Sequence, residues 1–113
     1  MHELSITRNV VAIVGERSAG RRVTRVKLEI GRLSGVMPDA VRFCFDICAA
    51  DTPLAGAALE IDEIPGLGCC NDCGARVTLQ APAGRCPGCG AGLRLIAGQE
   101  LNIREMEVET SCA

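Results

Sequence analysis

The chain has no tryptophan and no tyrosine, and its only aromatic rings are those of Phe43 and Phe45. Its formal net charge is −2, and no stripe of basic residues runs through it. Proteins that hold nucleic acids need stacking rings or a band of positive charge. Both absences therefore argue against a nucleic-acid-binding platform.

The sequence also lacks a hydrophobic signal segment at its start and any apolar run long enough to cross a bilayer. Eight cysteines without an export signal fit a reducing compartment, where thiols stay free. We therefore expect a cytoplasmic protein that does not contact membranes. A chain of 113 residues has room for one domain with a modest core and a small insert.

Cysteine is abundant, and four of the cysteines form two Cys-x-x-Cys pairs, Cys70/Cys73 and Cys86/Cys89. Each pair is followed by a glycine, which tolerates positive φ and lets backbone N–H groups turn toward the sulfurs. Two such turns complete a tetrahedral thiolate site, and their separation of about a dozen residues is near that of known zinc sites. The apolar run 77–79 between them suits a hairpin strand. This pattern predicts a zinc ribbon.

Two disulfides or a thioredoxin-like redox pair are the competing interpretations of the same cysteines. Disulfides need an oxidising compartment, and a redox Cys-x-x-Cys belongs at the start of a helix after a strand, which is not the context here. Cys69 adds an ambiguity, since its thiol could compete with Cys70 for the metal. The Cys-x-x-Cys-Gly spacing favours Cys70.

Two helices are expected outside the ribbon. Apolar residues recur at helical spacing from Leu4 to Val14, so the first helix is expected to begin almost at the N-terminus and to end near Arg17. Pro38 suits the first turn of a second helix that stops before Pro53. The residues expected on the apolar face of this second helix are Val41, Cys44, Phe45, Ile47 and Cys48.

Cys44 and Cys48 lie four residues apart on the second predicted helix. As metal ligands they would lack partners, whereas buried cysteine is common in protein cores. Packing is the simpler interpretation of this pair.

Three strands are expected from alternation of apolar and charged residues. Residues 25–30 alternate strictly, which predicts a strand with one face in water, and residues 59–62 repeat the pattern. Residues 100–109 alternate with a phase change between Arg104 and Glu105, which indicates a bulge or a bend.

These elements predict an α+β fold in two layers, with two helices packed on a three-stranded sheet and the ribbon inserted between two of its strands. We place the α+β domain at residues 1–66 and 97–113 and the zinc ribbon at residues 67–96. The order of the strands is not fixed by the sequence.

With these features together, the chain resembles the HypA/HybF family of hydrogenase nickel-incorporation accessory proteins. The resemblance lies in the N-terminal Met1–Ser5, in residues 25–36 and 42–45, and in the two cysteine pairs. It implies a metallochaperone that delivers Ni(II) during maturation of nickel-iron hydrogenase and, in some organisms, urease. It also implies two partners, the GTPase HypB and the hydrogenase large-subunit precursor. Many relatives carry a histidine beside the cysteine pairs, and this chain has none there.

The N-terminus is the candidate nickel site. The amine of Met1, one or two backbone amides and the imidazole of His2 can place nitrogen donors in a plane, which suits Ni(II) or Cu(II). His2 is the only histidine of the chain, and the resemblance at Met1-His2-Glu3 favours a ligand over an inert surface side chain. Glu3 has two interpretations, as a donor to the metal or as an acid favoured by the helix dipole.

Two other functions compete with a nickel metallochaperone. One is a zinc-ribbon adaptor that binds protein or nucleic acid without a second metal, and the other is a thiol oxidoreductase. No nucleophile, base and orienting group occur together, so no enzymatic activity is expected. The oligomeric state, monomer or homodimer, is left open, and Cys112 is expected to be an exposed thiol.

Overall fold

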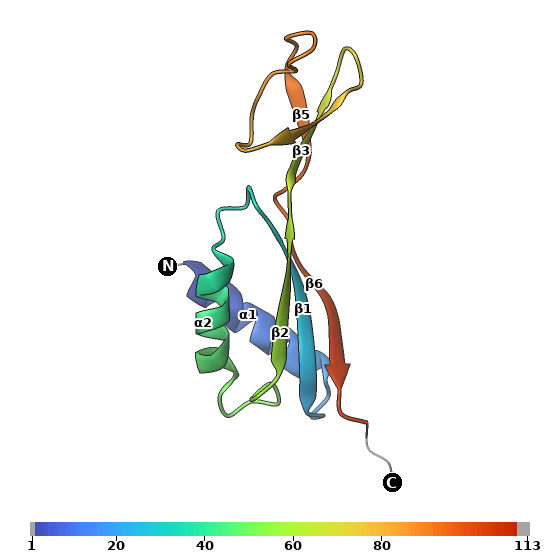
Figure 1. The fold of residues 1–113 in the computed structure, drawn as a ribbon. Coiled ribbons are helices and arrows are strands. Elements are labelled where there is room, and N and C mark those ends of the chain that lie inside the picture. Colours follow the sequence, from blue (N-terminus) through green and yellow to red (C-terminus); the bar gives the residue numbers. More distant parts are fainter. Residues whose placement is uncertain (1, 111–113) are drawn as a thin grey trace. The chain divides into compact units, whose positions relative to one another are not determined.

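The computed structural model describes residues 2–110 and contains two helices and six strands in that range. In chain order these are α1 His2–Arg17, β1 Val23–Gly31, α2 Pro38–Ala49, β2 Ala58–Ile64, β3 Gly66–Cys70, β4 Arg76–Leu79, β5 Leu93–Ala97 and β6 Leu101–Val108. The strands form two three-stranded sheets, ordered β2-β1-β6 and β4-β3-β5 (Figure 1). The predicted α+β fold is confirmed, and the sheet order places β1 at the centre of the first sheet.

The chain divides into two compact units. Unit 1 comprises residues 1–29, 37–62 and 102–113, and unit 2 comprises residues 30–36 and 63–101. The chain enters unit 2 twice, first as a short loop and then as the segment with the cysteine pairs. The division into an α+β domain at residues 1–66 and 97–113 and a ribbon at residues 67–96 stays a prediction.

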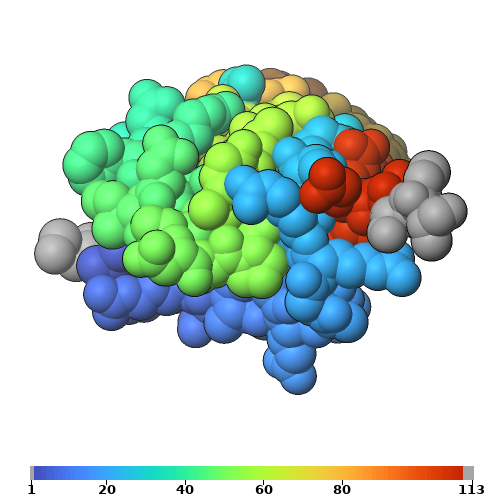
Figure 2. All heavy atoms as spheres, turned by 90° about the horizontal axis from the view of Figure 1, so that it is seen from below, coloured from blue at the N-terminus to red at the C-terminus, as the bar shows by residue number. Residues whose placement is uncertain are grey.

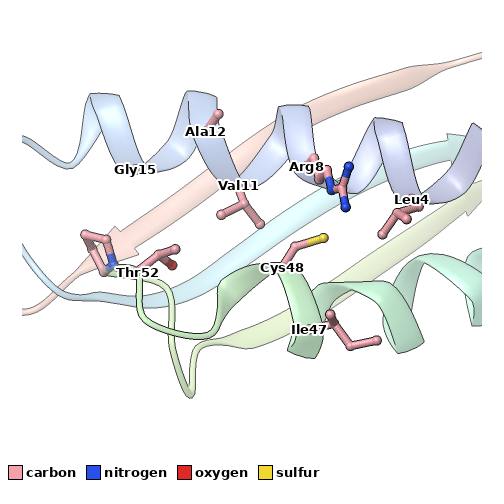
Figure 3. Close-up of a pocket in the computed structure, with 9 residues that line it drawn as sticks. Leu4, Arg8, Val11, Ala12, Gly15, Ile47, Cys48 and Thr52 are labelled. Carbon is pink, nitrogen blue, oxygen red and sulfur yellow. The ribbon is translucent and has the colours of Figure 1, made fainter.

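Unit 1 is built from α1 and α2, which pack against each other and on the sheet β2-β1-β6. Figure 2 shows the blue spheres of α1 directly against the green spheres of α2 and the chain that follows it. Val11 projects from α1 toward α2 (Figure 3). The core residues of this unit are Val10, Val11, Val14, Val23, Val26, Leu28, Val41, Phe45, Ala49 and Leu54.

The outer face of the first sheet carries charges, as the alternation in β1 predicts. Arg25 on the central strand bonds to Glu60 of β2 at 3.0 Å and to Glu105 and Glu107 of β6 at 2.9 and 3.2 Å. These carboxylates raise the pKa of Arg25. Because the three glutamate side chains are half exposed or more, each of these pairs adds little stability.

Unit 2 has β3 as its central strand, paired antiparallel with β4 and with β5. The end of β1 and the loop after it belong to this unit. The backbone N–H groups of residues 31–33 donate to the carbonyls of Ile64, Gly98 and Glu100 at 2.7 to 2.8 Å. The backbone segments around Gly66 and Gly98 approach each other closely. A Cβ on Gly98, whose φ is +119°, would lie 2.7 Å from the Cα of Gly66.

One feature of the predicted second helix is wrong. Val41 and Phe45 are buried, but Ile47 is 60% exposed. At 3.6 residues per turn, positions two apart point about 200° away from each other, so Phe45 and Ile47 cannot share one buried face. Cys44 and Cys48 are half-buried.

The predicted irregularity in the last strand is visible as a break in the alternation along β6. Ile103 and Met106 are both half-buried, with two exposed residues between them. No helix within residues 2–110 is long and apolar enough to span a membrane.

Candidate metal centre

The first cysteine pair lies in a tight turn between β3 and β4. The N–H of Cys70 donates to the carbonyl of Ala75 at 2.8 Å, and the N–H of Gly74 donates to the carbonyl of Cys70 at 3.0 Å. Gly74 has φ +75°, where a Cβ would introduce strain. The turn also directs the N–H of Cys73 at the Sγ of Cys70, at 3.5 Å.

The second pair repeats this geometry almost atom for atom. The N–H of Cys86 donates to the carbonyl of Ala91 at 2.8 Å, the N–H of Gly90 donates to the carbonyl of Cys86 at 2.8 Å, and Gly90 has φ +78°. In both turns the first cysteine is buried and the second is exposed. The glycine after each pair therefore has the role that its sequence position predicts.

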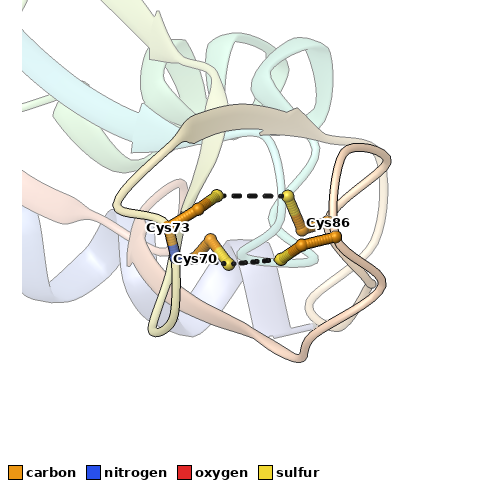
Figure 4. A group of neighbouring side chains, drawn as sticks. Cys70, Cys73 and Cys86 are labelled. Atoms are coloured by element: carbon orange, nitrogen blue, oxygen red, sulfur yellow. Dashed lines mark hydrogen bonds between the residues drawn. The ribbon is translucent and has the colours of Figure 1, made fainter.

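The two turns bring four sulfurs into one cluster of Cys70, Cys73, Cys86 and Cys89, with all Sγ atoms within 4.8 Å of one another. The Sγ atoms of Cys70 and Cys89 are 3.3 Å apart and those of Cys73 and Cys86 are 3.7 Å apart (Figure 4). A tetrahedral zinc ion with Zn–S bonds of 2.3 Å needs sulfurs about 3.8 Å apart. The donor set and its spacing therefore fit zinc.

The cluster is electrostatically prepared for a cation. Backbone N–H groups, first that of Cys73, lower the pKa of the Cys70 thiol to about 6, and the N–H of Cys89 likewise lowers the pKa of Cys86. The pKa of Cys73 is raised. For Cys89 the N–H of Ala91 lowers the pKa. The hydrogen bond between the thiols of Cys89 and Cys70 and the desolvation of the Cys89 sulfur outweigh this effect and raise the pKa to about 12. Each turn thus pairs one cysteine of lowered pKa with one of raised pKa, and a bound cation would displace the thiol protons.

Three further thiols of the described residues lie outside this cluster. Cys69 is half-buried, with its Sγ only in long contacts to the carbonyls of Cys70 and Gly74 at 3.8 and 3.9 Å. Cys44 and Cys48 lie on α2 in the other unit. The terminal amine of Met1 and the thiol of Cys112, both considered from the sequence, lie outside the described residues.

The N-terminal candidate residues differ sharply in burial. The side chain of His2 is 58% exposed, whereas that of Glu3 is 11% exposed, and the His2 Nε2 lies 3.8 Å from the Glu3 Oε2. The N–H of Met37 donates to the Glu3 carboxylate at 3.1 Å and lowers the pKa of Glu3. The imidazole therefore faces solvent beside a carboxylate that is already engaged.

Sequence reasoning missed the role of Glu3 at the start of α2. Met37 is the N-cap of α2 and provides no side-chain cap. In a capping box the third helical residue returns a carboxylate to the N-cap N–H, but that residue is Ala40 here. Glu3 supplies the carboxylate from α1 instead. The available signal was a helix start without a capping side chain, which requires an acceptor from elsewhere.

Comparison with known proteins gives one consistent result. The sequence model of the family described as "Hydrogenase/urease nickel incorporation, metallochaperone, hypA" matches residues 1–108. The chain is 58% identical over 113 residues to the hydrogenase maturation factor HypA of Nostoc sp., covering 99% of both chains. It is 51% identical over 110 residues to that of Geobacter metallireducens, covering 96% of this chain and 100% of the relative.

Two solved structures are similar in fold. One is the solution structure of the Ni metallochaperone HypA from Helicobacter pylori, with TM-score 0.65, 21% identity, and coverage of 98% of this chain and 100% of that chain. The other is titled as the solution structure of HypA protein, with TM-score 0.69, 22% identity, and coverage of 96% and 97%.

Proposed function

Because this chain belongs to the HypA family of hydrogenase maturation metallochaperones, we propose that it captures Ni(II) at its N-terminus and delivers it to a hydrogenase precursor. The observation that carries this proposal is the exposure of His2 beside the anchored Glu3. His2 is the one imidazole of the chain, and imidazole suits Ni(II). The packing of Glu3 holds this imidazole at the start of a helix and open to solvent.

The proposed nickel ligands are the amine of Met1, the imidazole and amide of His2, and Glu3. The first four N–H groups of a helix have no acceptor within it, and His2 is the first residue of α1, so its amide does not contribute to the hydrogen-bond ladder of the helix. Since the Glu3 carboxylate accepts the N–H of Met37, we propose that Glu3 supports the site by anchoring the start of α1 beside the nickel ligands.

We propose that the four-cysteine cluster holds one structural zinc ion through Cys70, Cys73, Cys86 and Cys89. Zinc would supply no chemistry here beyond cross-linking the two turns. The small apolar content of the ribbon supports this, because a metal then replaces part of a hydrophobic core. Soft thiolates and planar nitrogen donors suit different metals, so zinc and nickel have separate sites.

The proposed partners are a HypB-type GTPase and the hydrogenase large-subunit precursor, and urease is a further recipient of the nickel in this proposal. The chain would act in the cytoplasm, where its thiols stay reduced, without nucleic acid and without catalysis of its own. The alternative function is a zinc-ribbon adaptor with no second metal, and it differs by the absence of a nickel site.

Calorimetric titration of the untagged, zinc-loaded chain with Ni(II) tests the proposal. We expect about one tight nickel site per chain, no zinc release, and loss of that site in His2→Ala with zinc content and circular dichroism unchanged. Ser5→Ala on the same turn is the matched control. Nickel binding that His2→Ala leaves intact would reject the N-terminal site, and zinc release equal to nickel uptake would assign nickel to the cysteine cluster.

A further inference from the structure

A groove between α1 and α2 in unit 1 has no role in the metal sites. Its volume is about 440 Å³. From α1 it is lined by Leu4, Arg8, Val11, Ala12 and Gly15, and Figure 3 shows Leu4, Arg8 and Val11 projecting toward α2. These positions follow one side of the helix over about 16 Å, at a rise of 1.5 Å per residue.

The α2 side of the groove continues into exposed apolar surface. Ile47 and Cys48 line the groove, and the sulfur of Cys48 points toward α1 (Figure 3). Ile47 is 60% exposed and Phe43, one turn before it, is 72% exposed. Large apolar side chains that are neighbours on a helix and face water together are typical of a docking surface.

Gly15 gives a second reason to expect an occupant. Glycine within a helix is less stable than alanine, and Gly15 does not have positive φ. A Cβ there would meet only the Cδ1 of Leu54, at an ordinary contact distance of 3.8 Å. The fold therefore does not need this glycine, whereas a chain lying in the groove could use it to approach the backbone of α1 closely.

Arg8 is the only charged residue among those that line the groove. Within residues 2–110 no carboxylate pairs with its guanidinium. A positive charge in an apolar groove selects an occupant with a complementary carboxylate.

The walls of the groove indicate which secondary structure a bound segment would have. The two long walls are helices, whose N–H and C=O groups are satisfied internally. Thr52 and Pro53, which also line the groove, have their backbone groups bonded to Ala49, Ala55 and Val23. A strand lying in the groove would therefore gain no backbone hydrogen bonds. A helix satisfies its own backbone and presents side chains at i, i+3, i+4 and i+7, which is the usual mode for a groove of this kind. A lipid surface fits less well, because Asp39 and Asp46 on α2 are exposed and would repel anionic headgroups.

We propose that this groove binds an amphipathic helix of a partner protein, whose apolar face carries one carboxylate opposite Arg8. About three helical turns fill its length. The inference deepens the proposed function by naming the surface on which a partner protein docks, and it rests on that function only for the partner's role in nickel delivery.

The test is an NMR titration of the ¹⁵N-labelled, zinc-loaded full chain with cross-linked helical peptides of about three turns. Each peptide has one apolar face built from Leu, Ile, Met and Phe, and the panel includes several arrangements of these residues. For each arrangement, the central position of the apolar face is Glu, Gln or Lys. We expect saturable shifts at residues 4–15 and 44–53, with the Glu peptides binding about tenfold more tightly than the Lys peptides. Arg8→Glu should reverse this order, and Arg42→Glu, the same charge change on α2 outside the groove, should not.

Filling the groove gives a second readout. Gly15→Leu should abolish peptide binding. Ala12→Gln keeps a good helix former and should weaken peptide binding, and it replaces Gly15→Leu as the test variant if Gly15→Leu folds poorly. The inference is overturned by shifts confined to other surfaces, by an absence of saturable binding across the whole panel, or by a Glu preference that persists in Arg8→Glu. Self-association or binding to anionic vesicles that Arg8→Glu abolishes would identify a second copy or a lipid surface instead.

Nickel titration of the same variants separates this inference from the proposed function. Arg8→Glu should bind nickel as the parent does, since Arg8 is not one of the proposed ligands. A variant that loses peptide binding and keeps nickel binding tests the groove alone. A parent chain that binds no nickel would reject the proposed function, and the result for the groove would still hold.

Discussion

Glu3 joins two helices through one hydrogen bond, because its carboxylate accepts the N–H of Met37 at the start of α2. This contact could not be predicted from the sequence, since it connects residues that are 34 positions apart and depends on how α1 and α2 pack. The cysteine cluster was predictable, because the Cys-x-x-Cys-Gly spacing fixes each turn locally and only the meeting of the two turns is tertiary.

Replacing Glu3 by Gln should reduce thermal stability in a pH-dependent way. The N–H of Met37 lowers the pKa of Glu3 below its usual value of 4.5. The ionised carboxylate therefore stabilises the fold above that value, and its contribution is lost as pH falls through the folded-state pKa. The difference in Tm between parent and Glu3→Gln should be constant near neutral pH and should shrink below about pH 4.5.

Differential scanning fluorimetry across pH measures this difference. Loss of the proposed zinc ion in acid would affect both proteins alike, so it would cancel in the comparison. Glu16→Gln on the exposed surface of α1 is the matched control. A Tm difference that stays the same from neutral to acid pH would show that the charge of Glu3 is not what holds Met37.

At the scale of single elements, α1 should tolerate a side chain at Gly15. Gly15→Ala removes the flexibility of glycine from a helical position where a Cβ has an ordinary 3.8 Å contact. We expect the free energy of unfolding of unit 1 to rise by about 0.5 to 1 kcal/mol in urea titrations followed by circular dichroism. A decrease would mean that the fold itself requires glycine there, which would remove one argument for a groove occupant.

In contrast to Gly15, the glycine that follows the first cysteine pair should not tolerate a side chain. Gly74 has φ +75° with nothing within 4 Å of an added Cβ, so Gly74→Ala introduces backbone strain and no steric clash. Such strain amounts to about 1 to 2 kcal/mol, so zinc affinity measured against a chelator should fall about tenfold. Gly92→Ala, which has equal space and no positive φ, should leave zinc affinity unchanged.

The structure also shows why some elements were missed. β3 was not predicted from residues 66–70, because glycine at two of its five positions lacks the side chains that mark a strand. Those glycines are needed, since a Cβ on Gly66 would lie 2.5 Å from the carbonyl oxygen of Leu79 and a Cβ on Gly68 2.9 Å from its Cδ1. By contrast, β1 was predicted because Val26, Leu28 and Ile30 alternate with charged residues that face water.

For the whole molecule, removing the proposed zinc ion should unfold unit 2 and spare unit 1. Unit 1 has its own core, including Val14, Val41 and Leu54, whereas unit 2 depends on the cysteine cluster to connect its turns. Chelation, or Cys86→Ser, should therefore preserve the helical circular dichroism signal and abolish slow amide exchange in residues 63–101. Cys112→Ser is the control thiol change.

Residues 31–33 provide a sharper readout of the same prediction. Their N–H groups donate to Ile64, Gly98 and Glu100 in unit 2, so their exchange should accelerate with that of the ribbon, although Gly31 is the last residue of β1. Slow exchange that persists at residues 31–33 after zinc removal would mean that this loop is held without the metal.

The path of the chain has a consequence for proteolysis. The backbone crosses between the two units four times, near residues 29, 36, 62 and 101. A single cut in an exposed ribbon turn, such as the one around Pro82, yields two fragments that each contain parts of both units. Such a nicked protein would elute from a size-exclusion column as one particle, and its two fragments would separate only in denaturant. Release of the ribbon from the rest of the protein would require two cuts, one on each side of the ribbon.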